Sequence, residues 1–374
     1  MKSHDVLVRG TGAVGLACAL ALARQGLDVA LLGSLDEPKV PDVRAYALNA
    51  ASVRLLSTLK VWDALPADAR TPVHDMRVQG DAPGAALDFS AWSQSLSELA
   101  WIVDAAELER ALRTALRFAA HVSTSAGTAA AEAPATLHVL AEGKDSAARQ
   151  QRGVQMPRHA YGQHAIAARL SSAQAHAGLA QQWFRSPDVL ALLPLDRPQA
   201  GHGYGLVWSL PDARADALMA LPEAAFIDAL MDATGGAAGP LALCSPRAQW
   251  PLALAQAEAW HGPGWVLLGD AAHVVHPLAG QGLNLGLADV QALADVLAAR
   301  AEHEPWRSLA DPRLLARYAR ARRGAVAAMA GVTDGLWHLF ASQQPFVKEL
   351  RNRGLSLVNH LPPLKRLLTT TALG

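Results

Sequence analysis

A short glycine-rich turn near the start of the chain has the residue types and spacing to bind a dinucleotide. Gly10, Gly12 and Gly15 form a GxGxxG pattern around Ala13 and Val14. The first glycine permits a tight turn, the second lets a pyrophosphate approach the backbone, and the third lets the next helix pack on the preceding strand. The first N–H groups of that helix would face the phosphates. Six residues make a weak pattern, but the strand, helix and second strand around it favour nucleotide binding over an ordinary turn.

One position departs from the usual dinucleotide pattern. The second strand is expected to end in Glu or Asp, whose carboxylate binds the adenosine ribose. Here the strand runs through Leu32 into Gly33, which has no side chain to accept that hydrogen bond. Either Ser34 or Asp36 replaces the carboxylate from the following turn, or the nucleotide is held less tightly.

A second glycine-rich segment, residues 269–289, has the composition of a loop that contacts a flat ligand. An apolar strand ends at Gly269 and is followed by Asp270, whose carboxylate can bind a sugar or ribityl hydroxyl. Pro277 and the glycines at 280 and 282 would bring bare backbone against the ligand. The helix that begins here directs its N–H groups and its dipole towards negative charge, such as that on a reduced flavin.

This segment resembles the signature of the ubiquinone-biosynthesis hydroxylases, a family of FAD-dependent aromatic-ring monooxygenases with a para-hydroxybenzoate-hydroxylase-like fold. It reads GDAAH at residues 269–273 and HPLAGQGLNLGLAD at residues 276–289. Other stretches are similar to the family in the same order, namely residues 44–52 with 61–62, 161–163, 191–195, 207–210 and 361–366. The resemblance therefore spans nearly the whole chain.

The resemblance implies a set of site residues. The FAD-binding residues would be Gly10, Gly12, Ala13, Val14, Gly15, Arg44, Glu142, Gly143, Gly269, Asp270, Pro277, Gly280, Gln281, Gly282, Leu283 and Asn284. Those at the reaction centre would be Arg44, Pro277, Gly280 and Gln281. No catalytic triad is expected, because the cofactor itself carries this chemistry. No metal is expected.

The reaction implied is hydroxylation of a phenol ring, such as a ubiquinone precursor, with NADH or NADPH as electron donor and O2 as co-substrate. The substrate would be a small hydrophobic aromatic molecule between the flavin and a mixed sheet. Leu192, Leu193, Val207 and Trp208 are candidates to contact it, but ordinary core positions are the simpler interpretation. A reductase or a halogenase of the same fold is an alternative, because fold alone does not determine reaction type.

Two further departures concern the adenosine half of the cofactor. Family members carry Gly-Ala-Asp-Gly where this chain has Ala141, Glu142 and Gly143, with Ser146 and Arg149 at the family spacing. Residues 120–136 also look shorter than the family's segment. Either FAD still binds, or the chain is a non-catalytic, weakly flavin-binding member of a ubiquinone-biosynthesis assembly. The intact flavin-ring loop favours the first account.

Two charged clusters have simpler interpretations than a site. Asp270, His273 and His276 could be taken as metal ligands, but a structural role for His273 is favoured. The basic run from Arg317 to Arg323, which includes Arg322, is most simply a solvated helix face.

The elements expected around these motifs give an α/β fold. A Rossmann-like FAD-binding domain comprises residues 1–72, 98–155 and 260–305. A mixed-sheet substrate domain comprises residues 73–97 and 156–259, and a C-terminal helical region follows at 306–374. Residues 121–135, almost all small or polar, are predicted to form a loop.

Composition excludes several classes of protein. The 33 basic residues balance 33 acidic ones, which disfavours a nucleic-acid binder. Two cysteines, Cys18 and Cys244, argue against a disulfide scaffold and suit a reducing cytoplasm. No spanning helix is expected, and the apolar run at 13–23 fits a folded unit better than a signal peptide. Peripheral contact with the inner membrane, through residues 361–368, or with a biosynthetic complex is a weaker expectation. Oligomeric state is left open.

Overall fold

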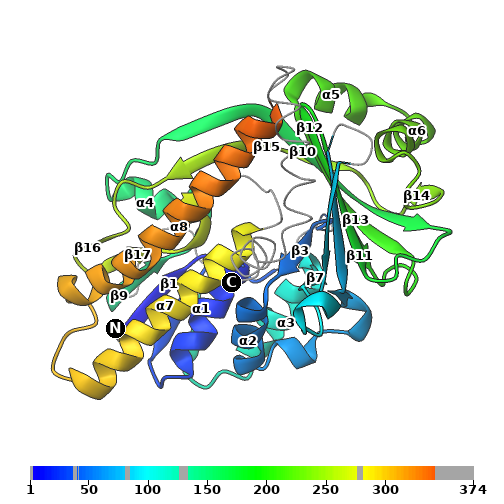
Figure 1. Ribbon diagram of the computed structural model, residues 1–374. Coiled ribbons are helices and arrows are strands. Elements are labelled where there is room, and N and C mark those ends of the chain that lie inside the picture. Colours follow the sequence, from blue (N-terminus) through cyan, green and yellow to red (C-terminus); the bar gives the residue numbers. More distant parts are fainter. Residues whose placement is uncertain are drawn as a thin grey trace.

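The structure is a computed structural model that describes residues 3–36, 40, 42–80, 85–125, 134–275 and 281–341. It contains a six-stranded sheet, a nine-stranded sheet and a three-stranded sheet (Figure 1). Pro277, Gly280, His276 and the segment 361–368 lie outside the described residues.

The six-stranded sheet carries the dinucleotide turn. Its order is β16-β17-β9-β1-β2-β8. The strands are β1 (His4–Arg9), β2 (Val29–Leu32), β8 (Val122–Ser125), β9 (Ala135–Leu140), β16 (His261–Gly262) and β17 (Trp265–Leu267). All neighbours are parallel except β16 and β17. The central strands are short apolar runs because a parallel sheet is buried on both faces.

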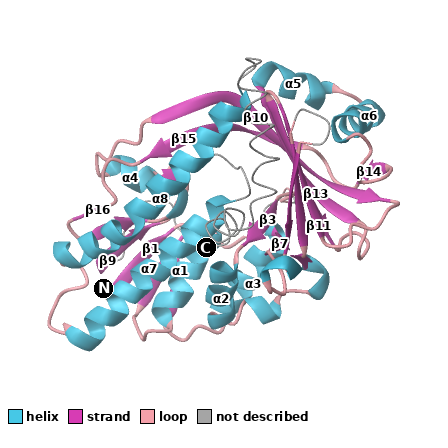
Figure 2. Ribbon diagram, in the orientation of Figure 1, coloured by secondary structure: helices cyan, strands magenta, loops and turns pink. Residues whose placement is uncertain are grey.

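Helices α1 (Ala13–Ala23), α3 (Ala105–Leu116), α7 (Gln281–His303) and α8 (Pro312–Ala341) pack with this sheet, and α7 contacts both α1 and α8 (Figure 2). The alanine-rich run that resembles a signal peptide forms α1, and ten of its eleven residues are buried. The folded-unit interpretation is confirmed.

One helical stretch among the described residues, Gly282–His303, is long and apolar enough to span a membrane, although the sequence predicted none. Just over half of it, 56%, is buried in the fold. Leu287, Val290 and Leu293 belong to the same core as α1. Core packing therefore accounts for its apolar residues, and this is weak evidence for a membrane span.

The nine-stranded sheet has the order β18-β15-β10-β13-β12-β11-β5-β6, with β14 paired to β10. Its strands are β5 (Asp75–Gln79), β6 (Ala86–Ser90), β10 (Arg158–Ser172), β11 (Leu179–Arg185), β12 (Asp188–Leu195), β13 (Gly203–Pro211), β14 (Leu241–Leu243), β15 (Ala248–Gln256) and β18 (His273–Val274). Helices α5 (Asp212–Ala220) and α6 (Glu223–Thr234) cover one face (Figure 1).

Alternation along these strands separates the four candidate substrate contacts. Leu192 and Trp208 belong to the core beneath α5 and α6. Leu193 packs in a different core, on the other face of the sheet, and Val207 is half-buried there. Successive strand residues point to opposite faces, so only Leu193 and Val207 face away from the helices.

The three-stranded sheet, β3-β7-β4, comprises β3 (Ala45–Leu48), β7 (Ala100–Asp104) and β4 (Arg70–Val73) and packs against β12. Helix α2 (Ala50–Thr58) follows β3. Asn49 caps α2, its side chain accepting a hydrogen bond from the N–H of Ser52. The segment from Arg44 to Ser52 thereby lies between the two larger sheets.

The predicted loop at residues 121–135 is wrong in part. Val122–Ser125 forms β8, which pairs with β2 in parallel and completes the edge of the six-stranded sheet. Its Val-Ser-Thr-Ser sequence has almost no apolar content, because this strand lies at the edge and is mostly exposed. Helix α5 and strands β3, β4 and β11 were also not predicted, since they are short or lack clear periodicity.

The predicted domain boundaries remain a prediction. The strands of the six-stranded sheet lie within the three ranges assigned to the FAD-binding domain. Those of the nine-stranded sheet, apart from β18, lie within the ranges assigned to the substrate domain.

Trp208 offers a test of the core beneath α5 and α6. Its side chain is fully buried, whereas Trp306 is 78% exposed. Trp208→Ala should lower the free energy of unfolding by about 3–5 kcal/mol, because it leaves a cavity. Trp306→Ala, the matched control, should change it by less than about 0.5 kcal/mol. Urea unfolding followed by circular dichroism measures both, and equal losses would contradict this packing.

Candidate cofactor and active site

The three glycines of the turn have different structural roles. Gly10 has φ +116°, and a Cβ there would lie 2.2 Å from the carbonyl oxygen of Ala141. A Cβ on Gly15 would lie 2.0 Å from the carbonyl oxygen of Gly10. A Cβ on Gly12 meets nothing within 4 Å. The first and third glycines therefore permit close backbone packing, and the second leaves the turn open to a ligand.

The first turn of α1 is suited to bind an anion. Gly12 is the N-cap residue and provides no side-chain hydrogen bond to the helix N–H groups. No acidic residue lies in the first turn. These N–H groups and the positive end of the helix dipole favour a phosphate. The turn therefore fits the pyrophosphate of a dinucleotide.

Val14 packs the second glycine-rich segment against the first. A Cβ on Gly286 would lie 2.5 Å from Cγ2 of Val14, and one on Gly269 would lie 3.3 Å from the same side chain. Ala13 is buried beside it. Helices α1 and α7 can approach this closely because residue 286 lacks a side chain, and Gly269 likewise lets the turn after β17 pack on Val14. Ala13 and Val14 therefore stabilise the turn through their packing contacts.

No carboxylate stands at the end of β2. A Cβ on Gly33 would lie 2.8 Å from Cγ2 of Thr11, so the Thr11 side chain fills that space. In the exposed turn that follows, the Ser34 hydroxyl donates to Oδ2 of Asp36 at 2.8 Å. These are the two residues considered as replacements for the missing acid.

Glu142 has all its strong hydrogen bonds within the protein. Its carboxylate accepts from Nε of Arg9 at 3.0 Å, from Oγ of Ser146 at 2.6 Å and from the N–H of Ala148 at 2.9 Å. Burial raises the pKa of Glu142, but these three partners outweigh it and hold the pKa below its ordinary value. Glu142 thereby anchors the short helix α4 (Ala147–Gln151) beside Gly143.

Arg149 links this region to the flavin-ring side. Its side chain is buried and donates to the carbonyl oxygens of Ala271 at 3.1 Å and Lys144 at 3.0 Å. The Ser146 and Arg149 spacing noted in the sequence therefore has a local structural basis.

Asp270 lies in a 3-10 turn, Gly269–Ala271, directly after β17. Its side chain is open to solvent. Desolvation by the surrounding protein raises the pKa of Asp270, and the charges of His273, Arg44 and Lys144, in that order, offset part of this rise. Asp270 thus lies at the carboxyl edge of a parallel sheet, where α/β folds bind their ligands.

Arg44 pairs with a neighbour. Its Nε lies 2.9 Å from Oδ1 of Asp42, and its Nη2 lies 2.6 Å from Oδ2. Burial raises the pKa of Asp42, but Arg44 outweighs it and the pKa is lowered. The guanidinium also lies 5.5 Å from the ring centre of Tyr46. The Arg44 side chain is therefore held in place by Asp42 and remains half-exposed.

Asn284 fastens the first turn of α7 to the β3–α2 segment. Its Oδ1 accepts from the N–H of Asn49 at 3.0 Å and from Oγ of Ser52 at 2.7 Å, and its Nδ2 donates to the carbonyl oxygen of Ala47 at 2.7 Å. The side chain is buried. Asn284 thus positions backbone near the expected flavin site. Gln281, Gly282 and Leu283 begin the same helix, and a Cβ on Gly282 would meet nothing within 4 Å.

A buried charge network, the Asp289 network, underlies this site. Asp289 is fully buried and accepts hydrogen bonds from Nε2 of His273 at 2.7 Å, Nε of Arg322 at 2.7 Å and the N–H of Gly269 at 2.9 Å. Burial raises the pKa of Asp289, but His273 and Arg322 outweigh it and lower the pKa. His273 also stacks on Trp260 at 5.0 Å.

The network confirms one prediction and corrects another. His273 is a hydrogen-bonded structural histidine, as predicted. Arg322, expected on a solvated helix face, is 9% exposed and binds Asp289 and the carbonyl oxygen of Leu285. The sequence did not reveal the burial of Arg322, because the spacing of the arginines alone does not show which face of α8 packs against α7.

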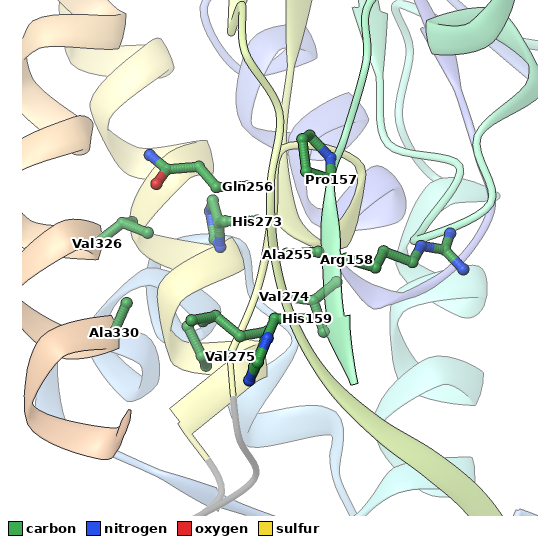
Figure 3. A pocket seen from close by; sticks show the side chains of 11 residues that line it. Pro157, Arg158, His159, Ala255, Gln256, His273, Val274, Val275, Val326 and Ala330 are labelled. Atoms are coloured by element: carbon green, nitrogen blue, oxygen red, sulfur yellow. The ribbon is translucent and has the colours of Figure 1, made fainter. Parts of the chain in front are cut away.

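A cavity of about 310 Å³ lies between α8 and the strands β10, β15 and β18. Figure 3 shows Gln256 extending from β15 towards α8, which contributes Val326 and Ala330 to the lining. None of the predicted cofactor-binding residues lines it. The cavity adjoins the Asp289 network and not the dinucleotide turn.

Comparisons with known proteins agree with this geometry. The family model described as FAD binding domain matches residues 3–333. The chain is 32% identical to the ubiquinone hydroxylase UbiL of Rhodospirillum rubrum, covering 100% of this chain and 90% of that protein. It is also 32% identical to 3-demethoxyubiquinol 3-hydroxylase of Escherichia coli, covering 99% and 98%. The chain belongs to the FAD-dependent aromatic-ring monooxygenases.

Solved structures share the fold of this monooxygenase. PqsL of Pseudomonas aeruginosa, in complex with 2-aminobenzoylacetate, matches with a TM-score of 0.79 at 20% identity, covering 95% of this chain and 99% of that one. HpxO of Klebsiella pneumoniae, with FAD and uric acid, matches with a TM-score of 0.75 at 18% identity, covering 99% and 97%. FAD is the cofactor of this monooxygenase, and the open Gly12 and uncapped α1 fit it.

Gly12 gives a direct test of cofactor binding. Gly12→Val should weaken FAD binding at least about tenfold, because the side chain enters the space that a pyrophosphate needs. The thermal midpoint of the FAD-free protein should change little, since a Cβ there meets no protein atom. Gly331→Ala, at an exposed position of α8, is the matched control and should keep the FAD affinity. Titration by flavin fluorescence measures both, and unchanged affinity in the Gly12 variant would place the pyrophosphate elsewhere.

Asp289 gives a test of the buried network. Asp289→Asn should cost about 3–5 kcal/mol of unfolding free energy, because it leaves Arg322 a buried, unpaired cation. The exposed Asp295→Asn on the same helix should cost less than about 0.5 kcal/mol. Because the folded-state pKa of Asp289 lies below 3.8, its contribution is present above that pH and is lost as the pH falls through the folded-state pKa. Urea unfolding between pH 3 and 7 measures this, and a variant with unaltered acid sensitivity would contradict it.

Proposed function

We propose that this monooxygenase hydroxylates the ring of a ubiquinone precursor or a related phenol, with NADH or NADPH as electron donor and O2 as co-substrate. One observation carries the proposal. Val14 packs against both Gly269 and Gly286, so the open turn at Gly12 and the carboxylate of Asp270 lie at the same edge of the six-stranded sheet. Two relatives named for ubiquinone hydroxylation, each 32% identical over nearly the full chain, support the choice of substrate.

In this proposal, separate parts of the chain hold separate parts of FAD. Gly12 and the first turn of α1 bind the pyrophosphate, and Asp270 binds a ribityl hydroxyl. The start of α7 at Gln281 and Gly282 lies against the flavin ring, where the helix dipole favours negative charge. Pro277 and Gly280 complete the loop. Arg44 lies at the ring edge, with its position held by Asp42.

Bound FAD, once reduced, activates O2 and supplies the oxygen that enters the substrate ring. The protein itself needs no acid–base pair for this transfer. Its residues orient the ring, exclude water and hold the flavin loop through Asn284 and Asp289. A cytoplasmic location, with peripheral contact to the membrane that dissolves a hydrophobic substrate, belongs to the same proposal.

Purified protein titrated with FAD and then mixed with NADH or NADPH tests the proposal. We expect saturable FAD binding, consumption of NAD(P)H that a prenylated phenol accelerates, and a product heavier by one oxygen atom in mass spectrometry. The Gly12→Val variant, which should bind FAD weakly, is the control: it measures any NAD(P)H oxidation that does not require bound FAD. NAD(P)H consumption without oxygenated product would indicate a reductase, and no FAD binding would contradict the proposal altogether.

A further inference from the structure

The end of strand β2 has no side chain that can bind a sugar hydroxyl. Dinucleotide-binding sheets usually have an acid there, and its carboxylate accepts hydrogen bonds from the adenosine ribose. Here Gly33 occupies the position, with φ +147°, a conformation that residues with a side chain rarely adopt. Its N–H donates to the carbonyl oxygen of Ser125 at 3.3 Å, so the backbone at this edge is fixed to β8. A ribose at this edge therefore needs a partner from another element.

The side chain of Thr11 lies where that acid would begin. A Cβ on Gly33 would lie 2.8 Å from Cγ2 of Thr11 and 3.2 Å from its Oγ1. Thr11 belongs to the glycine turn itself, between Gly10 and Gly12. Its methyl group thus packs against Gly33, and its hydroxyl oxygen lies beside the position from which an acidic side chain would extend. A hydroxyl thereby lies close to the position of the missing carboxylate.

The Thr11 hydroxyl is available to a ligand. Within the ranges that the structure describes, no residue forms a hydrogen bond with it. The side chain is half-buried, and its hydroxyl oxygen stays in contact with solvent. A hydroxyl both donates and accepts hydrogen bonds, as the hydroxyls of a ribose do. The threonine and a ribose are therefore matched in their hydrogen-bonding chemistry.

The other polar groups considered for the adenosine side already have partners. The Ser34 hydroxyl donates to Oδ2 of Asp36 at 2.8 Å and accepts from the N–H of Asp36 at 3.1 Å. The carboxylate of Glu142 accepts three hydrogen bonds from the protein. A ribose bound by Ser34 or Glu142 would compete with these bonds, whereas no described residue competes for the hydroxyl of Thr11.

We infer that the hydroxyl of Thr11 binds the adenosine ribose of FAD in place of the usual acid. The inference rests on the proposed position of the pyrophosphate at Gly12. One hydroxyl makes a neutral hydrogen bond, whereas a carboxylate can accept from both ribose hydroxyls and its charge strengthens each bond. The adenosine side of FAD is therefore still recognised, but through a weaker and uncharged contact.

A double-mutant cycle between the residue and the sugar tests the inference. Thr11→Val keeps the shape of the side chain and removes the hydroxyl. The ligand partner is an FAD analogue with a 2′,3′-dideoxyribose on its adenosine side. Flavin fluorescence titration of the full-length protein should show that Thr11→Val weakens FAD binding about three- to tenfold, the loss of one neutral hydrogen bond. With the dideoxy analogue the same substitution should change the affinity by less than about twofold.

Two variants serve as controls. Thr136→Val makes the same chemical change at an exposed position near the opposite edge of the six-stranded sheet, and it should keep the FAD affinity. Asp36→Asn tests the rival acid in the turn after β2, and it should also keep the affinity. Equal losses with FAD and the analogue, unchanged or tighter FAD binding by Thr11→Val, or a larger loss in Asp36→Asn would overturn the inference.

Two further measurements separate this contact from a folding defect and from the proposed function. Thr11→Ser keeps the hydroxyl and should bind FAD within about twofold of the wild-type protein. The wild-type comparison depends on no variant: equal affinity for FAD and the dideoxy analogue would overturn the inference and leave the proposed hydroxylation standing. Wild-type protein that binds neither flavin would contradict the proposed function and the inference with it.

Discussion

A single buried carboxylate holds the flavin-binding half of the molecule together. Asp289, on α7, receives hydrogen bonds from Gly269 and His273 of one short segment and from Arg322 of α8, which is 33 residues further along the chain. One charge therefore joins three structural elements. A buried charge is stable only when it is paired and fully hydrogen-bonded. The arrangement leaves little freedom to the residues on either side of the flavin-ring loop.

The opposite side of the same loop is held by neutral groups. Asn284 makes hydrogen bonds to Asn49, Ser52 and Ala47, so the first turn of α7 is tied to the segment that begins at Arg44. The charged network thus orients α7 against the six-stranded sheet, and the amide network orients it against the three-stranded sheet. Together they hold the start of α7 between the six-stranded and the three-stranded sheet.

The sequence predicted most of the fold because the strongly periodic segments were long. The GxGxxG turn lies between a strand and a helix, as expected. Strand β8 was missed because an exposed edge strand lacks the apolar residues on which such predictions depend. Arg322 was misjudged for a related reason, since burial of one residue in a basic run depends on which face of the helix packs.

The sequence predicted which residues form the site, but it did not predict the hydrogen bonds between them. Glu142 was expected to bind the cofactor, which stays a prediction. The sequence did not show that its carboxylate accepts hydrogen bonds from Arg9, Ser146 and Ala148. Asp289 was visible in the sequence motif, yet nothing in the spacing identified its partners. A contact between residues far apart in the chain cannot be read from either position alone.

The contact between Thr11 and Gly33 has a consequence for how this turn can change. A large acidic side chain at position 33 conflicts with threonine at position 11, and a smaller residue at 11 leaves a gap beside glycine at 33. The two positions therefore form a coupled pair whose substitutions are not additive. The unusual end of β2 and the residue inside the glycine turn therefore have to be considered together whenever either one is replaced.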